Sequence, residues 1–145
     1  MLQLAETIAK RSTCSRRQVG CVLVDQHGRV LSMGHNGVPQ GWQHCTDFPC
    51  KGVGLASGSG LDQCVAVHAE QNALMFCPDV MKIQTVYVTA SPCISCIKML
   101  MNTSAQRIVF RELYPHDDAA HLWKLHAGRV WPVQYNPSCW EHKPA

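Results

Sequence analysis

The segment that decides the fold is TVYVTASPCISC, residues 85–96. Its first half is rich in β-branched and aromatic residues and predicts a strand over residues 85–89. Ser91 and Pro92 follow in the pattern of an N-cap and a proline at the first helical position, so we expect a helix to begin there and run through Met101. A strand that passes directly into a helix is typical of an α/β domain.

Two thiols at the start of this helix are candidate metal ligands. Cys93 and Cys96 are three residues apart, so in the first helical turn both sulfurs lie on one face. The N-terminus of a helix lowers the pKa of a thiol, which makes thiolates available at neutral pH. A Cys-x-x-Cys pair taken alone is also typical of a redox pair or of half a structural zinc site.

A second motif, His68-Ala69-Glu70, lies at the start of a helix-compatible segment, residues 67–76. Residues i and i+2 inside a helix do not face each other, so His68 and Glu70 converge only if His68 takes the half-in position at the helix start. With Cys93 and Cys96, His68 would supply three ligands to Zn²⁺ and leave its fourth position open, as in catalytic zinc sites. The pattern H-x-E…P-C-x-x-C is the signature of zinc deaminases that act on nucleobases.

The motif predicts a specific chemistry. Zinc lowers the pKa of its bound water, and the resulting hydroxide would attack C4 of a cytosine ring. Glu70 would take the water proton, deliver it to ring N3, and carry a second proton to the leaving amine. The competing interpretation is a zinc-stabilised binding module without turnover. Glu70 argues against that interpretation, because a purely structural site needs no carboxylate beside its ligand.

The rest of the chain supplies the surrounding elements. Strands that alternate with helices after an initial hairpin predict a three-layer α/β/α domain over residues 1–135, followed by a tail over residues 136–145. We expect an amphipathic helix near residues 1–11, a hairpin over 19–34 with its turn at 25–28, strands over 107–110 and 129–131, and a helix over 117–126.

Composition limits the classes of function. The chain has 145 residues, 46% of them hydrophobic, and a net charge of +3. No apolar run approaches the roughly 20 residues of a membrane span, and the charge is too low for a nucleic-acid footprint. Nine cysteines, an odd number, and no recognisable export signal lead us to expect a reducing cytoplasm, that of the host if the source is a phage.

In these motifs and their surroundings the chain resembles the deoxycytidylate (dCMP) deaminases of the cytidine deaminase-like superfamily, particularly the bacterial and phage branch. The matching segments follow in order over roughly four-fifths of the chain, far more than a single motif. They are residues 12–20, 34–41, 57–73, 87–96 and 107–114.

The resemblance implies a five-stranded mixed sheet flanked by helices and a homo-oligomer, often a hexamer. It also implies conversion of dCMP to dUMP for thymidylate synthesis, activated by dCTP and inhibited by dTTP. Two alternatives stay open. One is a modified nucleotide substrate such as 5-methyl-dCMP; the other is a different nucleoside or a tRNA, although an RNA substrate demands a more basic surface.

Five residues are candidates for substrate binding. Asn36 matches the asparagine that contacts nucleotide in the family, although a turn residue between glycines is the alternative. Ala69, inside the central motif, is a second candidate. Arg16 and Arg17 are the best-placed cations for a 5′-phosphate, with ordinary solvated arginines as the alternative. Tyr114 follows the strand over residues 107–110 and would close over the base, or lie at the rim.

Four further cysteines suggest a second, structural zinc. All four lie beside irregular segments, and three of them fall in or flank a long segment, residues 34–61, that holds seven of the ten glycines and cannot hold itself by core burial. A Cys₄-type site would hold such a loop, and some family members carry an additional zinc in this region. The alternative is four inert thiols, and His44 is a substitute ligand. The four candidates are Cys14, Cys45, Cys50 and Cys64.

Overall fold

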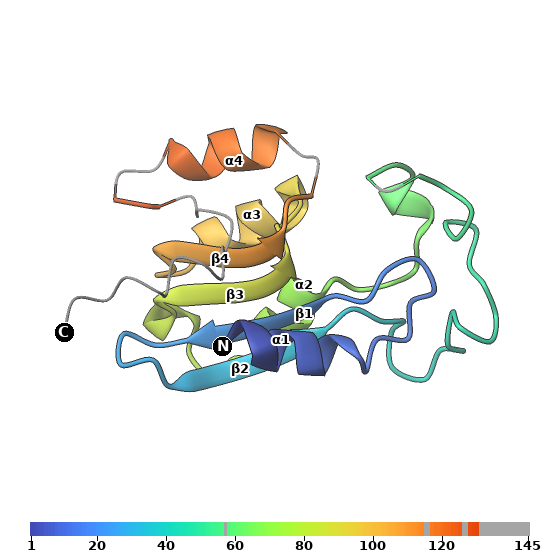
Figure 1. Cartoon of the computed structure of the whole chain (residues 1–145), viewed down its shortest axis with the longest axis horizontal. Helices are drawn as coiled ribbons and strands as arrows, with labels where there is room; N and C mark the ends of the chain where they lie inside the picture. The colour runs from blue at the N-terminus through green and yellow to red at the C-terminus, as the bar shows by residue number, and fades with distance from the viewer. Residues whose placement is uncertain (57, 115–116, 126–127, 131–145) are drawn as a thin grey trace, which may run out of the picture.

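The sheet is mixed and has four strands in the order β2-β1-β3-β4. The computed structural model describes residues 1–56, 58–114, 117–125 and 128–130 (Figure 1). β1 pairs antiparallel with both β2 and β3, whereas β3 and β4 run parallel. The strands are β1 (Gly20–Val24), β2 (Val30–His35), β3 (Thr85–Ala90) and β4 (Arg107–Glu112).

The expected fifth strand over residues 129–131 is wrong for the described residues. Val130 forms one isolated parallel bridge with Arg107, and its N–H donates to the Gln106 carbonyl at 2.9 Å. A single bridge does not make a strand, so the described sheet ends at β4. Trp131 and the predicted tail over residues 136–145 lie outside the described residues.

The predicted hairpin is confirmed as β1 and β2, and the turn between them is built by Asp25. Asp25 Oδ1 accepts the N–H groups of His27 at 2.8 Å and Arg29 at 2.9 Å. The hydrogen bond from Arg29 lowers the pKa of the Asp25 carboxyl. Gly28 has a φ of 76°, a left-handed conformation that favours glycine.

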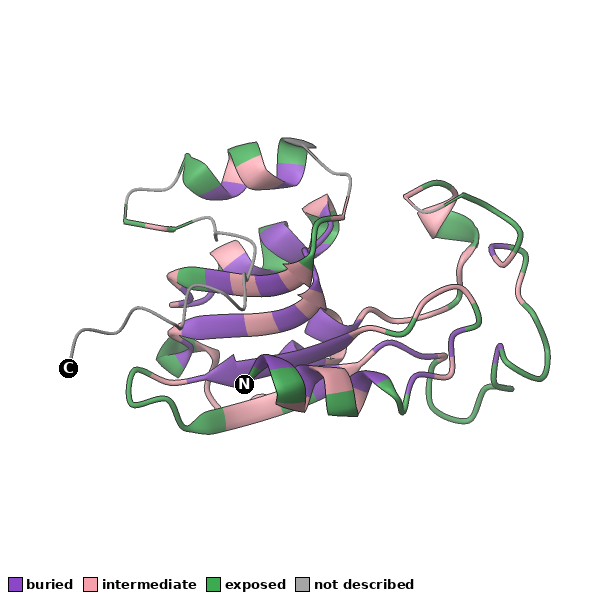
Figure 2. Cartoon of the chain, in the orientation of Figure 1, coloured by how far each residue is buried: buried purple, intermediate pink, exposed green. Residues whose placement is uncertain are grey.

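Helices cover both faces of the sheet, and the alternation of side chains along β1 assigns the two faces. Cys21 and Leu23 join the main core with residues of three helices, whereas Val22 and Val24 pack with Ala5 on the opposite face. Figure 2 shows β1 buried along its length. The helices are α1 (Leu2–Ala9) on the second face, and α2 (Ala69–Met75), α3 (Ile94–Met101) and α4 (Asp117–Lys124) on the first. In the described residues no helix has the length and apolar character needed to cross a membrane.

Two glycines let helices approach the sheet closely. A Cβ on Gly20 in β1 would lie 1.9 Å from the Ala5 carbonyl oxygen of α1. A Cβ on Gly34 in β2 would lie 2.4 Å from the Ala69 carbonyl oxygen and 2.4 Å from the Ala73 nitrogen of α2. No side chain fits at such distances, so glycine at both positions sets how deeply the helices pack.

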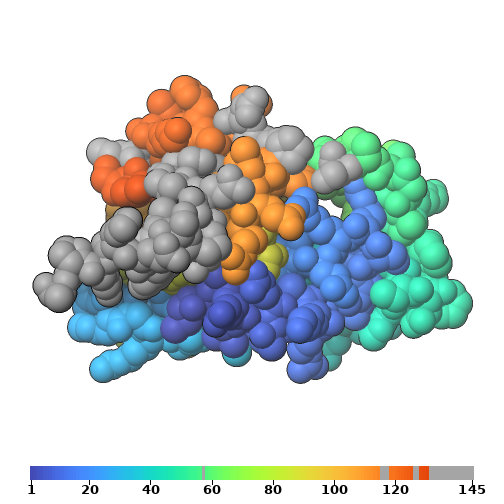
Figure 3. Space-filling model, viewed as in Figure 1, coloured from blue at the N-terminus to red at the C-terminus, as the bar shows by residue number. Residues whose placement is uncertain are grey.

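The segment between β2 and α2 is irregular, as expected. It reaches out beyond one end of the sheet and returns through the short 3₁₀ helix η1 (Leu61–Gln63) (Figure 1). A second 3₁₀ helix, η2 (Val80–Lys82), precedes β3. In the space-filling view the blue residues after α1 lie against the green part of this segment (Figure 3). The Ser15 hydroxyl and the Arg16 guanidinium make contacts there, donating to backbone carbonyls of the segment.

Candidate active site

The three predicted metal ligands meet where two helices begin. His68 is the N-cap of α2 and Cys93 is the N-cap of α3, each with extended backbone. The half-in position expected for His68 is therefore confirmed. The expectation for Ser91 and Pro92 is wrong, because α3 begins at Ile94, after both of them. The carbonyl of Cys93 accepts the Ile97 N–H at 2.9 Å and so starts the helix two residues later than the Ser-Pro pattern predicts.

The geometry of these three residues fits zinc. His68 Nδ1 lies 3.4 Å from Cys93 Sγ and 3.4 Å from Cys96 Sγ. A nitrogen and a sulfur that share one tetrahedral zinc, with bonds of about 2.0 Å and 2.3 Å, would lie about 3.5 Å apart. In the part of the chain that the structure describes, these are the one group of three such ligand atoms within 4.8 Å of one another. Two thiolates and an imidazole are the donor types that zinc prefers.

The two thiols are electrostatically coupled. The hydrogen bond from Cys96 lowers the pKa of Cys93 to about 4. The same hydrogen bond raises the pKa of Cys96, so the pair holds one thiolate and one proton without metal. The hydrogen bond with Cys93 raises the pKa of His68. Metal binding displaces such protons, which couples metal affinity to pH.

Glu70 lies beside the ligands and is buried. Its side chain comes from the first turn of α2, and the residue is only 4% exposed. Burial raises the pKa of its carboxyl to about 7, although the charge of His68 acts in the opposite direction. A carboxyl with a pKa near neutrality can both accept and donate a proton at working pH. Glu70 therefore has the environment that a proton carrier needs.

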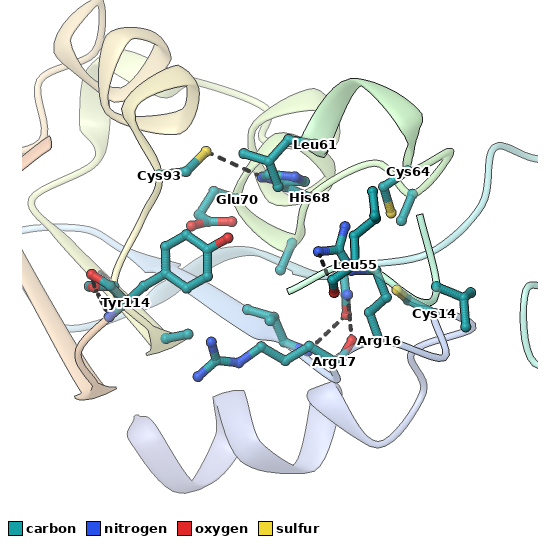
Figure 4. A pocket seen from close by; sticks show the side chains of 17 residues that line it. Cys14, Arg16, Arg17, Leu55, Leu61, Cys64, His68, Glu70, Cys93 and Tyr114 are labelled. Atoms are coloured by element: carbon teal, nitrogen blue, oxygen red, sulfur yellow. Dashed lines mark hydrogen bonds between the residues drawn. The ribbon is translucent and has the colours of Figure 1, made fainter. Parts of the chain in front are cut away.

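A cavity of about 190 Å³ leads to this group (Figure 4). Glu70, His68 and Cys93 lie along one wall, with Tyr114 and Arg17 facing them. All five residues predicted for substrate binding line this cavity; they are Asn36, Ala69, Arg16, Arg17 and Tyr114. The tertiary structure thus brings the predicted metal site and the predicted substrate residues to one place.

Asn36 is buried, and its amide group holds the backbone beside the cavity. Its Oδ1 accepts the Val19 N–H at 2.8 Å, and its Nδ2 donates to the Arg17 carbonyl at 2.7 Å. Both contacts fix the segment that carries Arg17 and leads into β1. Asn36 therefore positions Arg17 in addition to lining the cavity.

The two predicted phosphate-binding arginines have different surroundings. Arg16 Nη2 donates to the carbonyls of Leu55 at 3.4 Å, Ala56 at 2.9 Å and Ser59 at 3.1 Å. Arg17 forms an ion pair with Glu112, and its guanidinium carbon lies 5.5 Å from the centroid of the Tyr114 ring. Arg16 is thus committed to the long loop, whereas Arg17 is held by two side chains at the cavity.

Sequence reasoning missed part of the cavity wall. Val53, Leu55 and Leu61 of the long loop line the cavity, as does Ser91 after β3. The three apolar residues lie in a glycine-rich segment, and this contrast with their neighbours could have identified them as part of a cavity wall. Ser91 gave no such signal, because its sequence pattern matches a helix cap.

The four remaining cysteine candidates do not assemble in the way the first three ligands do. Cys14 and Cys64 line the cavity, whereas Cys45 Sγ accepts the Cys50 N–H at 3.4 Å. Burial raises the pKa of Cys45, but hydrogen bonds with Ser15 and Cys50 outweigh it and bring the pKa to about 7. Within the described residues, no three of these thiols bring their sulfur atoms within 4.8 Å of one another.

Comparison with known proteins gives a consistent family. Residues 1–112 match the family described as the cytidine and deoxycytidylate deaminase zinc-binding region. The deoxycytidylate deaminase of Schizosaccharomyces pombe is 36% identical over 94% of this chain, which spans 43% of that protein. The deoxycytidylate deaminase of Mycobacterium phage D29 is 39% identical over 75% of this chain and 89% of its own length.

A solved structure agrees with these sequence relatives. The dCMP deaminase of cyanophage S-TIM5, determined in complex with dCMP and dUMP, superposes with a TM-score of 0.68 at 25% identity. The match covers 90% of this chain and 91% of the cyanophage chain. The family match spans all three ligands of the metal centre and Glu70. The chain therefore belongs to the cytidine and deoxycytidylate deaminase family, defined by its zinc-binding region.

Proposed function

We propose that this protein is a zinc-dependent deaminase that hydrolyses dCMP to dUMP and ammonia. The observation that carries the proposal is the placement of Glu70, a buried carboxyl with a pKa of about 7, in the same cavity as His68 and Cys93. A structural metal site does not require a proton carrier beside an accessible cavity. A hydrolytic site needs one.

The residues divide the chemistry between them. His68, Cys93 and Cys96 would hold zinc, which supplies the positive charge that lowers the pKa of water toward neutrality. Glu70 takes one proton from the attacking water as the new C4–O bond forms, and passes it to ring N3. Glu70 then carries the second water proton to the exocyclic amine as the C4–N bond breaks. The balance is one water consumed and one ammonia released.

Several features support a nucleotide substrate. Arg17 and Tyr114 line the cavity opposite Glu70, and they offer a cation for a phosphate and an aromatic ring for a base. The relatives from fission yeast and phage D29 are named deoxycytidylate deaminases, and the cyanophage enzyme is solved with dCMP and dUMP. We assign Asn36, Ala69, Arg17 and Tyr114 to substrate binding, with Arg16 as a wall residue.

The test is ammonia release from a panel of substrates by the zinc-loaded protein. The panel contains dCMP, CMP, deoxycytidine, 5-methyl-dCMP and dCTP. We expect the highest kcat/KM for dCMP. A higher value for deoxycytidine would overturn the nucleotide assignment, and a higher value for 5-methyl-dCMP would move it to a modified nucleotide.

Glu70→Gln separates catalysis from metal binding. The amide keeps the size of the side chain but cannot carry the proton, so we expect zinc content to stay and kcat to fall by at least about 10²-fold. A variant with near-normal kcat would refute the role of Glu70. Loss of zinc would instead identify a structural role.

Further features of the family extend the proposal. We propose a single domain over residues 1–135, a homo-oligomer such as a hexamer, regulation by dCTP and dTTP, and a cytoplasmic role in supplying dUMP for thymidylate synthesis. A second zinc held by the four cysteines Cys14, Cys45, Cys50 and Cys64 also stays a proposal. It is supported by the position of Cys45, Cys50 and Cys64 in or just after the long loop, and by Cys14 and Cys64 lining the same cavity. One zinc per chain in freshly purified protein would refute this last proposal.

A further inference from the structure

Ser91 lies at the turn between β3 and α3, where its hydroxyl contacts a distant segment. The residue is 4% exposed and stands two positions before Cys93. Its Oγ accepts the Tyr114 N–H at 2.6 Å, and lies 3.4 Å from the Tyr114 carbonyl oxygen. Its own N–H donates to the Glu112 carbonyl at 2.9 Å. Ser91 therefore joins the turn that leads to the metal ligand with the chain that leaves β4.

The segment that Ser91 holds carries both partners of Arg17. Glu112 forms the ion pair with Arg17, and the Tyr114 ring lies beneath the Arg17 guanidinium. Arg17, Ser91 and Tyr114 all line the cavity, and Figure 4 shows Arg17 and Tyr114 turned toward it. The position of this wall thus depends on how firmly residues 112–114 are fixed.

We propose that Ser91 is a positioning residue that fixes the Tyr114 wall of the cavity and thereby sets how tightly substrate is held. This proposal rests on the proposed function for its substrate. The backbone bond from Ser91 to Glu112 persists in any variant other than proline, so the hydroxyl acts on Tyr114 alone. Tyr114 comes after the end of β4, and its N–H donates to the Ser91 side chain and not to a neighbouring strand.

Loss of the hydroxyl should affect binding more than chemistry. Without Ser91 Oγ the part-buried Tyr114 N–H loses its acceptor, and residues 112–114 are free to shift. The metal ligands and Glu70 are set by the starts of α2 and α3, which the hydroxyl does not hold. A change confined to the wall raises KM and leaves kcat nearly intact.

The experiment compares zinc-loaded wild type with Ser91→Ala, Ser91→Thr and Ser104→Ala. Ser104 is the matched control, because its hydroxyl also hydrogen-bonds to backbone, donating to the Ile83 carbonyl at 2.7 Å, and it does not line the cavity. For Ser91→Ala we expect unchanged zinc content, KM for dCMP raised about five- to tenfold, and kcat within about twofold. Ser91→Thr keeps the hydroxyl and should recover most of the KM, and Ser104→Ala should match wild type.

A second readout keeps this test separate from the substrate assignment. Amide hydrogen exchange at Tyr114, measured on the zinc-loaded protein, should be faster in Ser91→Ala than in wild type. Unchanged exchange, an unchanged KM, or a loss confined to kcat would each overturn the positioning role. If wild type fails to deaminate dCMP, the proposed function falls, while faster exchange at Tyr114 would still support the structural link.

Discussion

Gly34 lies so close to Ala69 that no side chain fits between them. A Cβ added to Gly34 would lie 2.4 Å from the carbonyl oxygen of Ala69, the residue between His68 and Glu70. The contact sets α2 directly against β2. The depth of this packing therefore fixes where the metal ligand and the proton carrier stand relative to α3.

We expect Gly34→Ala to disturb both stability and metal binding. The added methyl group collides with backbone, which cannot move aside as a flexible side chain does, so α2 must shift. Overpacking of this kind costs about 1–3 kcal/mol of unfolding free energy, and the shift should weaken zinc binding as well. Urea unfolding and zinc titration measure the two effects.

Gly54→Ala is the matched control for that substitution. A Cβ on Gly54 meets nothing within 4 Å, and its φ is not positive. Its unfolding free energy should stay within about 0.5 kcal/mol of wild type, with zinc affinity unchanged. Equal effects of the two substitutions would show that packing against Ala69 is unimportant.

Removal of one thiolate should remove the catalytic metal. Cys96→Ala leaves His68 and Cys93 as two donors, too few to hold zinc in a site with an open position. We expect the zinc content to fall by one atom per chain and ammonia release to stop. Cys77 is a thiol outside the ligand group, so Cys77→Ala should retain both the zinc and the ammonia release. Retention of zinc and activity by Cys96→Ala would exclude this ligand set.

Metal-free protein should lose stability as pH rises, because of Glu70. Burial raises the pKa of Glu70 from 4.5 to about 7 in the folded state, so the folded state binds the proton more tightly than the unfolded state. That stabilisation is fully present below pH 4.5 and is lost as pH rises through about 7.

The measurement is urea unfolding of chelator-treated wild type and Glu70→Gln between pH 4.5 and 8. The difference in unfolding free energy between the two proteins should change by about 3 kcal/mol over this range, because wild type loses stability at high pH. The glutamine variant has no carboxyl to titrate at this position and serves as the control for wild type. Parallel pH profiles would show that Glu70 is not buried as described.

Arg16 should hold the long loop closed. Its three bonds to the carbonyls of Leu55, Ala56 and Ser59 join residues about 40 positions apart in the chain. In Arg16→Met the stem remains but these bonds are lost, so we expect limited proteolysis within residues 55–59 to become about tenfold faster. Arg29→Met, at an exposed hairpin position, should leave the cleavage rate unchanged. Equal rates in wild type and Arg16→Met would show that other contacts hold the loop.

The sequence predicted those features that local chemistry specifies. The hairpin over β1 and β2 follows from the Asp25 turn, and the half-in position of His68 follows from its spacing to Glu70. The helix start near Cys93 was predicted two residues too early, because Ser91 and Pro92 match a cap pattern, whereas the Ser91 hydroxyl instead accepts the Tyr114 N–H. The fifth strand was predicted from residues 129–131 and from the family resemblance, and only the bridge at Val130 is present in the described residues.

By itself the sequence determined the ligand types, their spacing within each motif and the carboxylate beside them, because helix starts and i, i+3 faces depend on neighbouring residues. Only the tertiary structure decided that Arg17 pairs with Glu112, 95 positions away, and that Ser91 holds Tyr114. The physical reason is that such contacts depend on how the strands order in the sheet and how closely Gly20 and Gly34 let helices approach it. No local sequence pattern specifies that packing.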